Sequence, residues 1–395
     1  MATFLPLLLL LLFISAAMHD DYSLTLAYLF VGVTVAGAWW GRRSLAQVQH
    51  KRQFSDHAFL GEQIQIKLHI HNRGRLPVLW LGLRDSLPVA LSTTPFFQQV
   101  FSLGPGDETD FEYTVYANKR GYYPIGPLLV SSGDILGLNK PMHVENQAQY
   151  LTVYPKVIPL STIQIPSRSP HGTLRHHQQI FEDPARVFSK RDYVAGDSLR
   201  RVDWKASAAS GRLQTKLFEP TISLETLIFL DLNIETYHYR RRIEASELSI
   251  TIAASLASWI SGKQQTVGLR INGNDPLADD GIPPYLPPRK GKAQLMHILE
   301  ILARIQTVSH PPLADLVREQ RHHLSWGVTL IVVTGSADHA LLDELYQARR
   351  AGQNAILILA GPPIPSASNI AQRAEHFGIP MIHIHDERDL DIWRR

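Results

Sequence analysis

The sequence predicts a multidomain chain: an N-terminal transmembrane helical hairpin, a β-sandwich domain, and a C-terminal α/β domain with a mostly parallel sheet. Three observations support this. Two uncharged apolar stretches come first, period-two alternation follows them, and alternating strand and helix patterns fill the C-terminal half. The expected boundaries are 1–41 for the hairpin, 53–155 for the sandwich, 156–190 for a linker, 191–222 for a charged segment that packs on the last domain, and 223–395 for the α/β domain.

Composition excludes several classes of protein. A chain of 395 residues is long enough for two or three hydrophobic cores. It contains no Cys, so disulfides, thiolate metal sites and thiol nucleophiles are absent. The formal net charge is +3, and no basic stripe is interleaved with aromatic residues. We therefore expect no nucleic-acid partner.

The two apolar stretches are Phe4–Met18 and Tyr22–Trp40, separated by His19-Asp20-Asp21. The second has about the length that crosses a bilayer and ends in a Trp pair suited to the headgroup level. A cleaved signal peptide is the alternative, but no Lys or Arg precedes the first stretch. Four basic residues follow the second stretch: Arg42, Arg43, Lys51 and Arg52. This charge predicts a two-span membrane protein whose termini and soluble domains lie on the cytoplasmic side.

Alternating residues predict the β-sandwich. Gln63–Ile70 alternates polar and apolar side chains, and further strands are expected at 78–83, 111–116 and 128–131. Turn signals such as Gly104-Pro105-Gly106-Asp107 separate them. His69 and His71 flank Ile70 and are expected on the solvated face, where we do not expect a metal site.

The region after the irregular, His-containing linker alternates strands and helices. Strands are expected at 226–232, 266–271, 328–333, 355–359 and 381–384, and helices at 247–263, 292–306, 313–322 and 341–350. The helix at 247–263 is expected to be amphipathic. This order predicts a parallel sheet covered on both faces, with ligand sites at the carboxyl ends of its strands. No phosphate-loop or dinucleotide-binding signature is present.

The segment between these domains has the most distinctive pattern. Gly196-Asp197 predicts a turn, Asp197 or Ser198 can cap a short helix, and Arg200 and Asp203 are spaced to meet on one helical face. An edge strand is expected at 213–218. The simplest interpretation is an ion-pair network that braces this segment. Ser207 with Asp203 and Lys205 offers a nucleophile set only in composition, because no strained Gly-x-Ser-x-Gly turn presents the Ser.

This segment resembles the signature of the bacterial "domain of unknown function 58" family. The matching residues are Arg191, Tyr193, Gly196, Asp197, Arg200, Asp203, Trp204, Lys205, Ser207, Lys216 and Glu219. Arg120-Gly121-Tyr122-Tyr123 upstream also resembles that family's sandwich. The resemblance implies a transmembrane pair, a β-rich domain and a C-terminal domain similar to von Willebrand factor A. It further implies a MoxR-type AAA+ ATPase as partner, and sometimes a transglutaminase-like membrane protein.

Domains similar to von Willebrand factor A often hold Mg²⁺ with Asp-x-Ser-x-Ser after their first strand. Here the matching residues are Asp231, Asn233 and Glu235, so oxygen ligands remain but the second acid position is doubtful. His383 and His385, with Asp386, superficially resemble a metal-ligand set but lack a distant third ligand.

Two functions follow from these patterns. The first is a non-enzymatic membrane adaptor or scaffold whose A-like domain docks the ATPase or its clients. The second is a divalent-metal-dependent enzyme or metal-mediated adhesion module at the membrane. Binding of envelope components by the sandwich would require the opposite topology.

Overall fold

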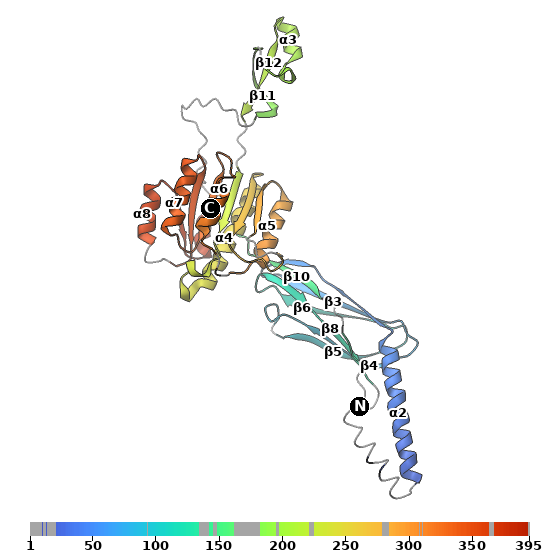
Figure 1. Ribbon diagram of the computed structural model, residues 1–395. Coiled ribbons are helices and arrows are strands. Elements are labelled where there is room, and N and C mark those ends of the chain that lie inside the picture. Colours follow the sequence, from blue (N-terminus) through green and yellow to red (C-terminus); the bar gives the residue numbers. More distant parts are fainter. Residues whose placement is uncertain are drawn as a thin grey trace. The chain divides into compact units, whose positions relative to one another are not determined.

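The structure is a computed structural model that describes residues 21–92, 94–133, 142–144, 148–161, 182–194, 197–220, 225–278, 284–307, 311–362 and 367–393, with the isolated residues 10, 13 and 309. The chain forms two compact units (Figure 1). The first comprises Met1–Lys156 with Leu299–Arg304, and the second comprises Val157–Ile298 with Ile305–Arg395.

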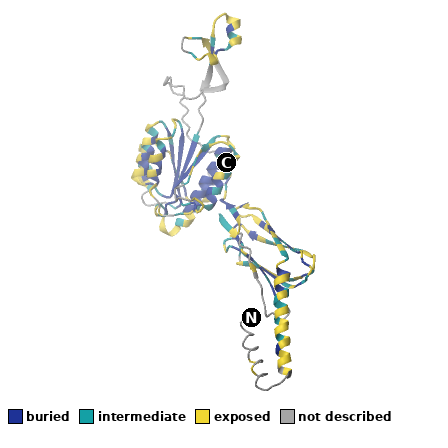
Figure 2. Cartoon of the chain, turned by 45° about the vertical axis from the view of Figure 1, so that its right-hand side comes forward, coloured by how far each residue is buried: buried dark blue, intermediate teal, exposed yellow. Residues whose placement is uncertain are grey.

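Helix α2 (Asp21–Leu45) begins the first unit, and its stretch Leu24–Leu45 is long and apolar enough to cross a membrane. Its side chains are exposed along most of its length (Figure 2). At its end, Ser44 and Leu45 are buried and the helix contacts strands β4 and β8. Nearly all of the expected first span, 4–18, lies outside the described residues, so the second helix of the hairpin stays a prediction.

The β-rich region predicted after α2 is confirmed. Its strands are β1 (Val48–Gln53), β2 (His57–Phe59), β3 (Gln63–Asn72), β4 (Val78–Ser86), β5 (Phe96–Leu103), β6 (Glu108–Tyr116), β7 (Gly121–Ile125), β8 (Leu128–Ser132), β9 (Met142–Val144) and β10 (Gln149–Tyr154). They form sheets in the orders β1-β3-β6, β2-β10-β7 and β5-β4-β8-β9. Leu68 and Ile70 of one sheet share a core with Leu81 and Val130 of another, which is the packing of a sandwich.

A buried ion pair crosses this core. The Arg52 guanidinium donates to both carboxylate oxygens of Asp85, at 3.0 and 2.8 Å, and Tyr113 donates its hydroxyl to Asp85 at 2.7 Å. The desolvating core raises the pKa of Tyr113. The expectation that Arg52 belongs to a basic cluster beside the membrane is therefore wrong, because its charge is satisfied inside the sandwich.

His69 and His71 of β3 lie on the more exposed face of their sheet, as predicted. His69 contacts the Asp110 carboxylate on β6, and His71 Nδ1 lies 3.2 Å from Glu108 Oε1. Both histidines are thus engaged by acids of the neighbouring strand.

The second unit contains a six-stranded sheet in the order β15-β14-β13-β16-β17-β18. Its strands are β13 (Glu225–Leu230), β14 (Thr266–Ile271), β15 (Tyr285–Arg289), β16 (Thr329–Thr334), β17 (Asn354–Ala360) and β18 (Met381–Ile384). All neighbours run parallel except β15. This is the doubly wound order, in which the topology reverses between β13 and β16.

The helices of this unit are α4 (Arg242–Gly262), α6 (Leu313–Arg321), α7 (His339–Arg350) and α8 (Ala367–His376), with short 3-10 turns η2 (Ile234–Thr236), η3 (Tyr239–Arg241) and η4 (Glu387–Trp393). Helix α5 (Lys292–Arg304) begins in this unit, and its residues from Leu299 on belong to the first. The prediction of an amphipathic helix at 247–263 is wrong, because α4 is buried on nearly every side. Strand β15 escaped prediction because it contains Pro287 and Pro288, which are tolerated only at a sheet edge.

A small hairpin lies between the sandwich and the six-stranded sheet in sequence. Strand β11 (Glu182–Asp192) pairs antiparallel with β12 (Gln214–Pro220), and these two strands form a sheet of their own. Between them lie the 3-10 turn η1 (Leu199–Arg201) and helix α3 (Trp204–Ser210). Strand β11 begins inside the segment expected to be a linker.

Candidate functional site

Three neighbouring strands of the six-stranded sheet end in polar residues that meet around Asp231. Asp231 follows β13, Asn272 follows β14, and Thr334 ends β16. The Asp231 carboxylate accepts from Asn272 Nδ2 at 2.7 Å and from the Asn233 N–H at 3.0 Å, while Thr334 Oγ1 lies 2.7 Å away. This polar cluster therefore occupies the switch point, where ligands bind in doubly wound sheets.

The hydrogen count of the polar cluster favours a neutral Asp231. Thr334 Oγ1 lies 2.7 Å from Asp231 Oδ2 and also 2.7 Å from the Ser336 carbonyl oxygen. One hydroxyl hydrogen can serve only one of these acceptors, so a proton on the carboxyl completes both bonds. Burial also raises the pKa of Asp231, although its hydrogen-bond donors oppose the shift. Geometry and desolvation agree on the protonated acid.

Tyr237 closes the polar cluster from the side of α4. Its hydroxyl contacts the Asp231 carbonyl oxygen and lies 2.9 Å from Ser249 Oγ. The ring packs so closely against the end of β16 that a Cβ on Gly335 would lie 2.4 Å from it. Glycine at this position therefore permits the close approach. Asn272 also accepts from the Leu232 N–H at 2.5 Å, so both ends of its amide are used.

Two of the three predicted metal ligands lie in the polar cluster and the third does not. Asn233 is buried, and its side-chain oxygen accepts from the Glu235 N–H at 3.0 Å. The Glu235 side chain is exposed. Within the described part of the chain, no group of three or more His, Asp or Glu residues is placed to hold a metal ion. Asn272 and Thr334 were missed because they lie 41 and 103 residues from Asp231 in sequence. Tyr237 lies only six residues after Asp231, but no local pattern predicts that the chain turns back to place its hydroxyl there.

The charged segment forms the second candidate site, the tip of the β11–β12 hairpin. Asp197 accepts from Arg191 at 2.7 Å and from the Val194 N–H at 3.1 Å. Asp203 caps α3 by accepting from the Ala206 N–H at 3.2 Å and pairs with Lys190 at 2.8 Å. The hydrogen bonds from Arg191 and Lys190 lower the pKa of Asp197 and Asp203 respectively. Both acids are thus used to shape the tip.

Ser207 joins the two halves of the tip. Its hydroxyl donates to the Asp203 carbonyl oxygen at 2.8 Å and accepts from the Gln214 N–H at 2.9 Å. The residue is buried, so its oxygen is not presented as a nucleophile. Helix α3 then ends at Gly211, which takes the left-handed conformation with φ of 66°.

The structure corrects other details of the predicted segment. The Arg200–Asp203 pair does not form: Arg200 is exposed in η1, and Lys190 is the partner of Asp203. Ser198 precedes η1 without a side-chain cap. Tyr193 and Lys216 are partly buried, whereas Gly196 and the Glu219 side chain lie outside the described residues.

Apolar and basic side chains cover the outside of the tip. Trp204 is 64% exposed, Leu199 62% and Val194 60%. Exposed basic residues surround them: Arg200, Arg201, Lys205 and Arg212. The tip, defined here as residues 193–194 and 197–213, therefore combines internally satisfied acids with an apolar and cationic surface. Large exposed apolar side chains with neighbouring cations are typical of docking surfaces.

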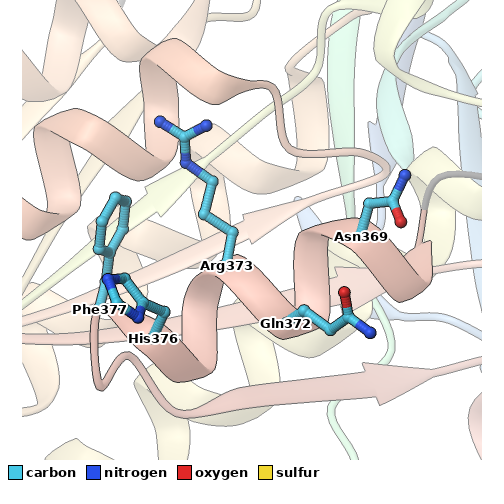
Figure 3. Close-up of a pocket in the computed structure, with 5 residues that line it drawn as sticks. All are labelled: Asn369, Gln372, Arg373, His376 and Phe377. Atoms are coloured by element: carbon cyan, nitrogen blue, oxygen red, sulfur yellow. The ribbon is translucent and has the colours of Figure 1, made fainter.

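Two further places in the second unit are weak candidates for a ligand site. His383 Nε2 lies 2.9 Å from the Gly361 carbonyl oxygen and its ring packs on His385; burial lowers its pKa. A hollow on α8 is shown in Figure 3. Its lining residues are Asn369, Gln372, Arg373, His376 and Phe377. Arg373 already donates to Asp343 at 2.8 Å, so its charge is not free for a ligand.

Part of the chain matches a known protein family. Residues 189–345 match the family described as "Protein of unknown function DUF58". The chain is 23% identical over 314 residues to "Uncharacterized protein YeaD" of Bacillus subtilis (strain 168), covering 76% of this chain and 72% of that protein.

Solved structures give weaker likenesses. An aerotolerance-related membrane protein from Bacteroides fragilis NCTC 9343 is 12% identical, covering 43% of this chain and 96% of that one, with a TM-score of 0.32. The SpRpn10 VWA domain is 12% identical over 43% of this chain and 94% of its own, with a TM-score of 0.31. The CARDB domain of the PF1109 protein from Pyrococcus furiosus is 18% identical, covering 27% of this chain and 91% of that domain, with a TM-score of 0.20.

Proposed function

We propose that this chain, which belongs to the DUF58 family of proteins of unknown function, is a non-enzymatic membrane adaptor that docks a partner protein through its hairpin tip. Helix α2 holds the chain at the bilayer. The soluble units stand on the cytoplasmic side of a bacterial inner membrane, with a second span at 4–18. The basic residues Arg42 and Arg43 directly after the apolar stretch support this orientation.

One observation carries the adaptor function: the tip uses its acids internally and leaves Trp204 and Leu199 exposed. A catalytic site needs polar groups presented to a substrate, yet the polar cluster around Asp231 is closed by its own hydrogen bonds. Exposed Trp beside Arg is the composition found at binding hot spots. The fitting partner therefore offers an apolar pocket with acidic residues at its rim.

We assign that partner as a MoxR-type AAA+ ATPase, with its clients and a transglutaminase-like membrane protein as further members of the assembly. The resemblance of residues 191–219 to the family signature supports this assignment. The basic tip also suits an acidic docking surface, since cations at an interface rim mainly speed encounter and select partners.

The test is retention of the purified ATPase from the same bacterium by the full-length protein in nanodiscs. We expect Trp204→Ser to weaken binding at least about tenfold, as is usual for a buried hot-spot Trp. Trp326→Ser is the matched control, because Trp326 is also exposed, at 53%, on the same unit. Failure of the wild-type protein to bind would reject the ATPase as the partner. An equal loss of binding in the Trp204 and Trp326 variants would reject the tip as the docking surface. A reporter fused to the C-terminus tests the topology.

A second candidate is the divalent-metal-dependent enzyme or metal-mediated adhesion module. The position of Asp231 and Asn233 at the switch point of the sheet favours it. Asp231 is 1% exposed and its carboxyl already contacts Thr334 and Asn272, so Mg²⁺ could reach it only after a local rearrangement. Calorimetric titration with Mg²⁺ and Mn²⁺ decides: saturable binding that Asp231→Asn removes supports the metal site, and no binding, or equal binding by both proteins, rejects it.

A further inference from the structure

The end of helix α2 is fixed to the sandwich without a linker. Trp40 Nε1 donates to the Pro77 carbonyl oxygen at 3.1 Å, and the buried Leu45 belongs to the same core cluster as Val78. Strand β1 begins at Val48, only three residues after the helix ends. The end of the sandwich next to α2 is therefore held at the level where the helix leaves the hydrocarbon core of the bilayer.

That level can be placed along the helix. The uncharged stretch Tyr22–Trp40 rises about 28 Å at roughly 1.5 Å per residue, close to the thickness of the hydrocarbon core. Trp39 is 60% exposed and Trp40 faces the sandwich. Trp side chains prefer the headgroup region. Since Trp40 bonds Pro77, the β3–β4 loop also lies among the headgroups.

The β3–β4 loop, residues 73–77, has a fixed shape. Asn72 Nδ2 donates to the carbonyl oxygens of Leu76 at 3.0 Å and Gly104 at 2.9 Å, and Asn72 Oδ1 accepts from the Gly74 N–H at 2.9 Å. The Arg73 N–H donates to the Gln47 carbonyl oxygen at 3.2 Å, beside the end of α2. This loop therefore cannot swing away from the helix without losing several hydrogen bonds.

The fixed loop presents cations to the same level as the helix end. Arg73 and Arg75 are exposed, like Arg42 and Arg43, and Leu79 is 41% exposed at the start of β4. We call Arg42, Arg43, Arg73 and Arg75 the collar, and Leu79 lies beside it. Among the described residues, none of its four guanidinium groups has an ion-pair partner. Long Arg side chains at this level extend into the headgroup layer.

We propose that the collar is a binding surface for anionic phospholipid headgroups, built jointly by the end of α2 and the β3–β4 loop of the sandwich. The lipid is an anionic phospholipid of the bilayer that α2 crosses, so the inference rests on α2 being the anchor proposed above. Guanidinium groups recognise phosphate in fork geometry, and each basic residue near an anionic surface favours it about fivefold. The collar thereby orients the sandwich on the membrane.

A single-cysteine reporter tests this in the full chain, which has no native Cys. Leu79→Cys is labelled with a fluorophore in nanodiscs, and quenching by headgroup-spin-labelled phosphatidylglycerol is compared with quenching by equally labelled phosphatidylcholine. Asn118→Cys is the position control, because Asn118 is exposed beyond the opposite end of β6. We expect the Leu79 site to be quenched at least about threefold more by the anionic lipid, and the Asn118 site to be quenched by neither.

Charge variants separate lipid recognition from mere proximity. Arg73→Gln with Arg75→Gln is expected to reduce the anionic-lipid preference by roughly half or more. Arg73→Lys with Arg75→Lys should retain most of it, and Lys119→Gln with Lys290→Gln, exposed elsewhere, should leave it unchanged. Equal quenching by both lipids, or a preference that survives the Gln substitutions, overturns the collar. Failure of the chain to enter nanodiscs overturns the anchor itself, whereas the ATPase assay tests the tip independently.

Discussion

The polar cluster around Asp231 and the hairpin tip both contain aspartates with several hydrogen bonds, but burial gives them opposite electrostatics. Asp231 is 1% exposed, and desolvation raises its pKa. Asp197 and Asp203 lie near solvent, and hydrogen bonds from Arg191 and Lys190 lower the pKa values of these two carboxyls. The first carboxyl is buried, which favours its protonated form, and it ties three strand ends together. The other two are charged and hold a loop in shape.

This difference shows what each region can do. In the sheet, every polar atom of Asp231 is needed by a neighbour, so removal of the side chain leaves buried donors without partners. In the tip, the ion pairs are partly hydrated and each contributes little. The tip can therefore present apolar residues to a partner at a small cost in stability, whereas the polar cluster belongs to the core.

The largest expected effect comes from Asp231→Ala. This change leaves the Asn272 side-chain N–H and the Asn233 N–H unsatisfied, at about 1–3 kcal/mol each before relaxation. The Thr334 hydroxyl keeps its contact with the Ser336 carbonyl oxygen. We expect a loss of about 3 kcal/mol or more in the unfolding of the second unit, measured by calorimetry of the full chain.

Asp231→Asn is the matched control, because an amide reproduces the hydrogen-bond pattern of a protonated acid: its oxygen accepts from Asn272 and its NH₂ donates to Thr334. We expect it to lie within about 1 kcal/mol of the wild-type protein. If the Asn variant is as unstable as the Ala variant, the carboxylate is required in its charged form and the comparison fails.

The next effect is a pH dependence. The pKa of Asp231 is raised above its unfolded value of 3.8, so the folded state holds the proton more tightly. Raising the pH through the folded-state pKa ionises the buried carboxyl, and stability is lost with increasing pH. We expect the wild-type protein to lose stability relative to Asp231→Asn as the pH rises from 5 to 8.5, measured as a widening gap in Tm. A constant gap would mean that Asp231 does not titrate in this range.

Local patterns predicted most strands of the six-stranded sheet, and the resemblance to von Willebrand factor A domains singled out Asp231, but neither indicated the neighbours of Asp231. Asn272 and Thr334 end strands that the sequence identifies, yet strand order, which sets β14 and β16 on either side of β13, is a tertiary property. In the tip, spacing favoured an Arg200–Asp203 pair. Asp203 instead lies at the N-cap of α3 with an extended backbone, which points its carboxylate to the first turn and to Lys190 across the hairpin. Helical spacing does not apply to a cap.

A smaller effect is expected in the tip from Asp203→Ala. It removes the cap of α3 and the Lys190 pair, so helix α3 loses local stability. Hydrogen exchange should speed up in α3 while the Tm of the second unit stays unchanged. Because the pKa of Asp203 is lowered, the same loosening should appear in the wild-type protein as the pH falls through that pKa. Asp203→Asn keeps a capping side chain, so hydrogen exchange in α3 should speed up less than in Asp203→Ala. A loss of stability across the whole second unit would show that the tip is part of its core.

The smallest effect on stability is expected from Trp204→Ser. This variant separates a role of the tip in binding from a role in folding. Trp204 is 64% exposed, so its removal should change the free energy of unfolding by no more than about 0.5 kcal/mol. Partner binding should nevertheless fall by the tenfold expected of a docking Trp. Calorimetry and the ATPase binding assay on the same preparation measure both quantities. A marked fall in Tm would place Trp204 in a structural contact, and the exposed tip would then be a folding element.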